Sequence, residues 1–122
     1  MALHCSFEHF EKNSDVKFIK EASRVLKKGG KLCILPLYLF NRYSIQIDPS
    51  VLPKGHLFEN DAILYCVRGT SLRHCRFYDI SHLITRIRNN LKDLKITIYF
   101  VQNEKKIDPN CYIKFIALFE KL

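Results

Sequence analysis

The spacing of apolar residues predicts a helix followed by a buried strand in the first third of the chain. Apolar positions recur at helical spacing over 15–28, behind polar residues at 13–15 that suit a helix cap. The stretch KLCILPLYLF at 31–40 is apolar almost throughout, which is typical of a strand buried on both faces of a parallel sheet. Gly29 fits the left-handed residue that follows a helix, and Pro36 ends regular strand pairing.

The second half of the chain predicts another helix and then a pair of antiparallel strands. Asp79 suits the cap of a helix whose apolar positions share one face: Ile80, Leu83, Ile84, Ile87 and Leu91. The stretch 94–103 alternates as a strand, and 111–122 is apolar enough for a second strand after a short turn. Two strands joined by a short turn run antiparallel.

The remaining stretches are less regular. Met1–Leu3 has the composition of the last residues of a strand that runs into a loop. Between 41 and 78 the pattern has no clear period, and DAILYCVRG at 61–69 suits either a short strand or an edge hairpin. A loop of this length in a compact domain usually carries function or an insertion. The order of elements is that of an α/β protein that ends in an antiparallel pair.

The composition agrees with a single domain over residues 1–122. The chain is 48% hydrophobic and 26% charged, so it can bury a core. The longest apolar run, 32–40, contains Pro36 and is too short to cross a bilayer. No basic and apolar leader precedes a cleavage site of small residues. We therefore expect a soluble, cytoplasmic protein without a membrane partner.

Cysteine usage and charge narrow the candidate chemistry. The five cysteines are odd in number and form no CxxC pair, so we expect neither a disulfide framework nor a metal site. A metal or a nucleophilic thiol stays open only at the adjacent pairs His4-Cys5 and His74-Cys75.

The net charge of +8 can favour nucleic acid or another anionic partner, although a solvated basic surface explains it as well. Basic residues concentrate locally at Arg68, Arg73, His74 and Arg76. No helix-turn-helix, zinc finger or aromatic-basic sheet motif is present. We therefore expect no specific nucleic-acid partner, and at most weak binding that falls steeply with salt.

The stretch from Ser6 to Leu39 resembles the second half of class I S-adenosylmethionine-dependent methyltransferases, most closely the small-molecule type 11 group. Phe7-Glu8-His9 matches the "LEH"-like signature that follows the fourth strand of that family. Arg24–Gly30 matches the "RVLKPGG" motif before the fifth strand, with Lys28 in place of the usual proline. The resemblance covers essentially the whole chain, although beyond residue 41 it rests on topology.

The resemblance implies the C-terminal half of a methyltransferase-type domain. Its fold would be a partial Rossmann-like sheet of order 4-5-7-6, with the last strand antiparallel and flanking helices. The family binds its cofactor through a glycine-rich loop after the first strand, because the backbone must approach the ligand closely there. None of the four glycines of this chain has GxGxG spacing, and Gly29-Gly30 precedes a strand instead of following one. We therefore expect that this chain alone does not bind S-adenosylmethionine.

The resemblance also places candidate site residues around the end of the fourth strand. Met1, Ala2, Leu3 and His4 would line the wall beside the methionine part of the cofactor, although His4 is otherwise a polar loop residue. His9 would handle a proton and Glu8 would contact substrate. The alternative is that Glu8 and His9 only fix the turn into the helix by hydrogen bonds.

Three further residues are candidates for substrate binding. Tyr38 and Tyr43 follow the fifth strand, where they would contact substrate or lie as half-buried aromatic residues with a wet hydroxyl. Arg76, with its neighbours Arg73 and Tyr78, would face an anionic substrate or belong to the surface.

Different functions follow from these observations. The first is a methyltransferase-family protein whose full-length relatives methylate small molecules, here shortened and inactive alone. The second is an interaction module, because a sheet without its first strands exposes an edge that can pair with a second copy or with the missing half. The third is the weak nucleic-acid binder described above.

Overall fold

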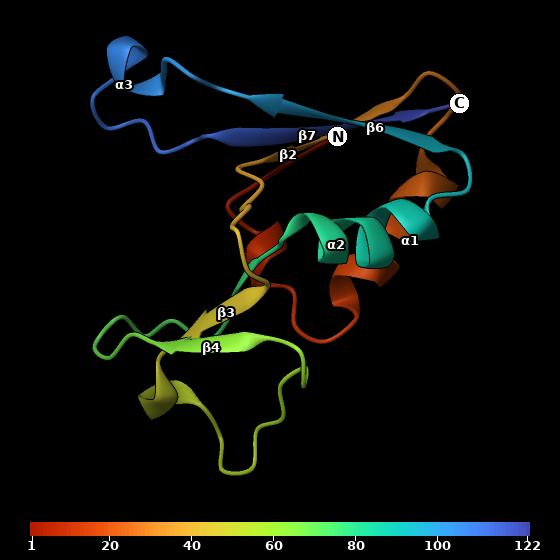
Figure 1. Ribbon diagram of the computed structural model, residues 1–122. Coiled ribbons are helices and arrows are strands. Elements are labelled where there is room, and N and C mark those ends of the chain that lie inside the picture. Colours follow the sequence, from red (N-terminus) through yellow and green to blue (C-terminus); the bar gives the residue numbers. More distant parts are fainter.

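The computed structural model describes residues 1–122 and contains two sheets (Figure 1). The larger sheet has the strand order β1-β2-β7-β6. Its strands are β1 (Ala2–His4), β2 (Lys31–Leu35), β7 (Phe115–Lys121) and β6 (Leu94–Phe100). β1 and β2 are parallel, and β7 runs antiparallel to both of its neighbours. The predicted strand order and the antiparallel last strand are therefore confirmed.

Helix α1 (Ser14–Val25) connects β1 to β2 and packs on one face of this sheet. Its buried residues Ile19 and Ala22 join a core to which the sheet contributes Leu32, Ile34, Ala117 and Phe119. The helix ends at Val25, earlier than the predicted boundary at residue 28, because Leu26 has extended backbone angles.

The two glycines after α1 close a turn. The Gly30 N–H donates to the Lys27 carbonyl oxygen at 2.7 Å, and Gly29 between them has φ +74°. A turn with positive φ at its third residue requires glycine there. A Cβ on Gly30 would lie 2.7 Å from the Lys27 oxygen, so a side chain is excluded sterically. Gly29 is left-handed as predicted, but it belongs to a turn that starts after the helix has ended.

The second helical region is less regular than its pattern predicts. The Asp79 carboxylate accepts the His82 N–H at 2.8 Å, which confirms the predicted cap. One turn of α-helix, α2 (Ile80–His82), then gives way to a π-helical turn over Leu83–Ile87 and a 3₁₀ turn over Arg88–Asn90. The wider π turn rotates the following side chains. Leu83 and Ile87 are buried, whereas Ile80 and Ile84 of the predicted face are exposed.

The connection between β6 and β7 is longer than predicted. It runs from Val101 to Lys114 and contains a single helical turn, α3 (Glu104–Ile107). Figure 1 shows α3 at the far tip of the β6–β7 hairpin. This connection places Tyr112, just before β7, near the carboxyl end of β1.

The irregular middle of the chain forms a second sheet of order β4-β3-β5. Its strands are β3 (Ser44–Ile47), β4 (Ile63–Cys66) and β5 (Cys75–Phe77). β4 lies within the predicted 61–69 stretch, but it pairs parallel to β3 and therefore forms no hairpin with it. The sequence pattern gave no sign of β3. Tyr78 joins the two sheets, since its N–H and carbonyl bond to the chain that leaves β2.

The large sheet is covered on one face only. Figure 1 shows α1 and α2 on the same side of it. Strand alternation and register place Cys33, Leu35, Ile116 and Leu118 together on the opposite face, where all four are only partly buried. The covered face carries the fully buried residues of the core.

Candidate functional site

The carboxyl ends of β1 and β2 lie side by side and define the place where a ligand is expected. His4 is in register with Leu35, and the Cys5 N–H donates to the Leu35 carbonyl at 3.1 Å. In open α/β sheets, ligands bind outside the carboxyl ends of parallel strands. The residues that follow these strands, together with Tyr112, therefore form the candidate site.

A cluster of His4, Cys5 and Tyr112 lies at the end of β1. The Cys5 Sγ is 3.4 Å from the His4 Nε2 and 3.0 Å from the Tyr112 hydroxyl, which in turn is 3.4 Å from the same Nε2. The hydrogen bond to Cys5 raises the pKa of Tyr112, so the phenol keeps its proton near neutral pH. The structure thus brings the predicted residue His4 together with Tyr112, which sequence reasoning missed because 108 positions separate the two.

A cavity of about 330 Å³ opens beside this cluster. Tyr38, Phe77, Tyr112 and Phe115 contribute aromatic side chains to its wall, and Glu104, Lys105 and Lys114 contribute charged ones. The rings of Tyr38 and Phe77 lie 5.0 Å apart between centroids. Burial, and then the charge of Glu8, raise the pKa of Tyr38 to about 12. Tyr38 therefore lines the cavity as a neutral phenol, and its contact with substrate stays a prediction.

Glu8 and His9 follow in a 3₁₀ turn, Phe7–His9, directly after this end of β1. The Glu8 side chain is 5% exposed, and its Oε2 has no hydrogen-bond partner. Its Oε1 lies 3.6 Å from the His9 Nε2. The His9 Nδ1 is 2.6 Å from the His74 carbonyl oxygen, so Nδ1 carries a proton and donates it. The arrangement holds His9 in one orientation beside a carboxylate, which suits proton transfer and also suits a structural turn.

A second, polar cavity of about 280 Å³ lies on the His9 side. Its lining includes His9, Glu11, Arg73 and His74. Glu11 pairs with Arg73, and burial lowers the pKa of His74 to about 4, so His74 is neutral. The His74 Nε2 is buried without a partner.

Arg76 does not face a substrate, contrary to the sequence-based hypothesis. Its side chain is fully buried and lies 3.0 Å from Asp15. It also pairs with Glu59 and donates to the carbonyls of Phe10 and Lys12. Because these partners engage the guanidinium, Arg76 belongs to the core.

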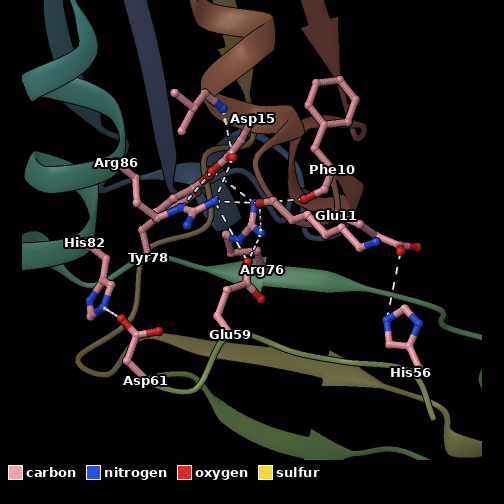
Figure 2. A network of polar contacts seen from close by, with 12 residues as sticks. Phe10, Glu11, Asp15, His56, Glu59, Asp61, Arg76, Tyr78, His82 and Arg86 are labelled. Carbon is pink, nitrogen blue, oxygen red and sulfur yellow. Dashed lines mark hydrogen bonds and ion pairs between the residues drawn. The ribbon is translucent and has the colours of Figure 1, made fainter.

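Figure 2 shows the network around Arg76, which links residues 10–15, Glu59, residues 76–78 and Arg86. Asp15 of α1 accepts hydrogen bonds from the Tyr78 hydroxyl at 2.6 Å and from Arg86 at 2.8 Å. Burial alone would raise the pKa of Asp15, but hydrogen bonds with Arg86 and the charge of Arg76 outweigh it and lower the pKa. Asp15 therefore stays ionised and holds β5 and the second helical region against α1.

Tyr43 also lies in the core, away from the cavity wall. It is 3% exposed and stacks on His82 with centroids 3.9 Å apart. Burial raises its pKa to about 12. Its hydroxyl is buried without a partner, so the wet hydroxyl considered for Tyr43 is absent here.

The first residues of the chain, which the resemblance implies as a cofactor wall, lie along β1. The Met1 amino group donates to the Lys31 carbonyl at 2.8 Å, and its side chain is exposed. Strand alternation puts Ala2 and His4 on the uncovered face of the sheet, whereas Leu3 packs against the core on the other face. Ala2 and His4 thus lie on the free face of the sheet beside the candidate site, whereas Leu3 belongs to the core side.

The local concentration of basic residues does not form one surface. Arg76 and His74 are buried, and Arg73 pairs with Glu11. No group of His, Cys, Asp and Glu side chains is arranged to hold a metal ion, and all five cysteines are free.

Comparisons of the chain with protein-family models, curated proteins and solved structures found no match. None of the helices has the length and apolar composition that crossing a membrane requires.

Proposed function

We propose that the chain forms the acceptor-side half of a small-molecule methyltransferase-type domain that uses S-adenosylmethionine. The observation that carries the proposal is the strand order β1-β2-β7-β6, in which β7 is inserted antiparallel beside two parallel strands. The family resemblance implies this partial Rossmann-like order for its fourth, fifth, seventh and sixth strands. Sequence resemblance and topology thus agree on the same half of the domain.

The residues that carry the resemblance lie at matching places in the fold. Phe7-Glu8-His9 begins three residues after the end of β1, next to the candidate site. The RVLKKGG motif ends α1 and forms the turn into β2. The resemblance implies these positions for the two motifs, and this agreement supports the proposal.

The open edge and the uncovered face of the large sheet are evidence that another half of the domain packs there. β1 is an edge strand, and the face with Cys33, Leu35, Ile116 and Leu118 has no helix over it. Parallel sheets are normally covered on both faces. The cofactor-binding half of such a domain would pair with β1 and cover this face.

The chain lacks the cradle that the cofactor needs. Gly29 and Gly30 form the turn after α1, while Gly55 and Gly69 lie in turns that lead into no helix. A strand, a glycine loop and a helix N-terminus do not occur in that order. In the family the cofactor supplies the methyl group, and the residues described here would position the acceptor.

Cofactor titration tests the proposal. Calorimetry of the chain with S-adenosylmethionine should show no saturable binding tighter than about 1 mM. Co-expression with the cofactor-binding half of a type 11 methyltransferase should give a complex that purifies together and binds the cofactor. Micromolar binding by the chain alone would contradict the half-domain proposal, as would failure of the two halves to associate.

The same free edge favours a second function, pairing with another copy of the chain. The Cys33 N–H bonds to the Met1 carbonyl and the Cys5 N–H to the Leu35 carbonyl. Because pairing groups alternate along a strand, the N–H groups of Ala2 and His4 point toward the open edge. That edge can accept a further strand.

Light scattering after size exclusion tests this second function. The wild-type chain should form a dimer that dissociates on dilution. Ala2→Pro removes an edge N–H and keeps the bonds to β2, so this variant should be monomeric. A wild-type monomer at every concentration would rule the homodimer out.

A further inference from the structure

The aromatic cavity beside β2 has walls that suit a flat ring. Tyr38 follows β2, Phe77 ends β5, and Tyr112 precedes β7, so different parts of the chain build the cavity. Aromatic side chains prefer offset or edge-on contacts with other rings. An apolar cavity of about 150 Å³ is enough to hold benzene. A cavity of about 330 Å³ therefore has room for one substituted ring.

One wall of the cavity carries a hydroxyl group linked to a base. Tyr112 lines the cavity, and its hydroxyl lies 3.4 Å from the His4 Nε2. Tyr112 is 51% exposed and His4 is also exposed, so neither is locked into the core. The Cys5 thiol lies 3.0 Å from the same hydroxyl, and Glu8 and Cys111 also face Tyr112. The charged groups on the cavity wall are Glu104, Lys105 and Lys114.

We propose that the cavity binds a small phenol and that Tyr112 and His4 accept its hydroxyl proton. The phenol ring lies against Tyr38 and Phe77, and its hydroxyl donates to the Tyr112 oxygen. As the phenol O–H bond breaks, its proton goes to that oxygen, and the proton of Tyr112 goes to the His4 Nε2. The products are a bound phenolate and an imidazolium, with charge and protons conserved.

This inference names the acceptor class and so rests on the proposed function, but its chemistry needs no cofactor. A phenolate is a better nucleophile than a phenol, which is what a methyl acceptor requires. Lys105 and Lys114 on the cavity wall also favour the negative oxygen, whereas Glu104, which lies 3.8 Å from Lys114, opposes it.

Absorbance titration with 4-nitrophenol tests the inference, because its phenolate absorbs visible light and the neutral phenol does not. At a fixed pH near 7, the full chain should increase the phenolate signal saturably, with half-saturation at about 1 mM or below. His4→Gln and Tyr112→Phe should still bind the probe, but the ionisation constant of the bound probe should fall about tenfold in each.

Control variants separate the contributions. His56→Gln should behave like the wild type, because His56 lies in the connection between β3 and β4 and does not line this cavity. Lys114→Met measures how much the lysine charge contributes to ionisation of the bound probe. Phe77→Leu removes an aromatic wall and should weaken binding of the probe. Absence of saturable binding by the wild type would overturn the inference, and so would His4→Gln and Tyr112→Phe variants that ionise the probe as well as the wild type does.

The outcome is independent of the cofactor experiment. If the two halves fail to associate while His4-dependent ionisation is seen, the methyltransferase proposal fails and the phenol site stands. If the halves associate and bind cofactor while the probe does not bind, only the phenol site fails.

Discussion

Arg76 illustrates how a single buried charge holds separate segments together. Its guanidinium lies in the core against Asp15 and Glu59. It also donates hydrogen bonds to the backbone carbonyls of Phe10 and Lys12. Removal of one partner of a buried ion pair leaves the other charge without compensation. The side chain is therefore structural, although its residue type alone suggested anion binding.

We expect Arg76→Met to lower the free energy of unfolding by about 3–5 kcal/mol, because Asp15 loses a buried partner. Urea denaturation followed by circular dichroism measures the change. Arg73→Met is the matched control, since Arg73 is half-exposed and pairs with Glu11 at the surface. The control should cost about 1 kcal/mol or less. Equal losses in both variants would contradict the assigned role of Arg76.

Because His74 is buried in its neutral form, we expect the free energy of unfolding to fall on acidification. Burial lowers its pKa from 6.5 in the unfolded chain to about 4 in the folded protein. The unfolded chain therefore binds a proton first as the pH falls, and stability drops between about pH 6.5 and pH 4. His74→Phe should remove a few kcal/mol of this dependence, as measured by urea denaturation across that range. An unchanged pH profile in the variant would show that His74 does not titrate in this way.

The pKa of His82 shifts in the opposite direction to that of His74, so His82 serves as the comparison. Burial alone would lower its pKa, but hydrogen bonds with Asp61 and Asp79 outweigh it and raise the pKa. Its contribution to stability is therefore present at low pH and disappears as the pH rises through the folded pKa. His82→Gln should flatten the alkaline side of the profile and leave the acidic side as it is.

At the scale of elements, the turn between α1 and β2 has Lys28 where the methyltransferase motif that it resembles has proline. The turn Lys27–Gly30 has positive φ at Gly29, so Lys28 occupies the position at which proline is favoured. The Lys28 N–H donates no backbone hydrogen bond, so proline would remove none. Proline at a compatible position stabilises mainly by restricting the unfolded chain.

We expect Lys28→Pro to raise the free energy of unfolding by about 0.4–1 kcal/mol. Thermal unfolding measures the change as a higher Tm. Gly29→Ala is the opposing variant and should destabilise, because alanine disfavours φ +74°. A lower Tm for Lys28→Pro would show that Lys28 does not have the φ of that turn position.

The elements themselves were predicted unevenly. The strong periodic pattern of α1 and the apolar run of β2 depend on local spacing, and both elements were found. The π turn at Leu83–Ile87 was not, because a helical pattern assumes a constant number of residues per turn. β3 gave no signal because its four residues are too few to show a clear alternation.

At the scale of the whole molecule, the two sheets differ in how well they are protected. β2 and β7 contain Leu32, Ile34, Ala117 and Phe119, all fully or almost fully buried in the core. β4 is an edge strand, and each of its residues is exposed. Local opening costs least where few apolar contacts are lost.

Hydrogen exchange should reflect this difference. Amides of β2 and β7 should exchange slowest, near the rate set by global unfolding, while those of β4 should exchange fastest among the strands. NMR or mass spectrometry after dilution into heavy water measures the order. Protection of β4 equal to that of β2 would indicate that another chain covers the β4 edge.

The location of the candidate site was partly readable from sequence. His4, Glu8 and Tyr38 follow predicted strands, and ends of parallel strands meet at one edge, so their proximity was expected. Tyr112 has no such signal, because it comes from an irregular connection near the end of the chain. Arg76 and Tyr43 were placed wrongly at the site, since residue type does not tell whether an arginine or a tyrosine finds partners in the core.

The sequence by itself determined the elements with strong local patterns and the spacing of its four glycines, and its resemblance to a known family predicted the sheet order. Only the tertiary structure decided that Tyr112 contacts His4 and Cys5. It also decided that Arg76 forms ion pairs with Asp15 and Glu59. The physical reason is that periodicity and turn chemistry act between neighbours in the chain. Burial and polar pairing between residues such as Asp15 and Arg76 depend on which distant segments the packed core brings together.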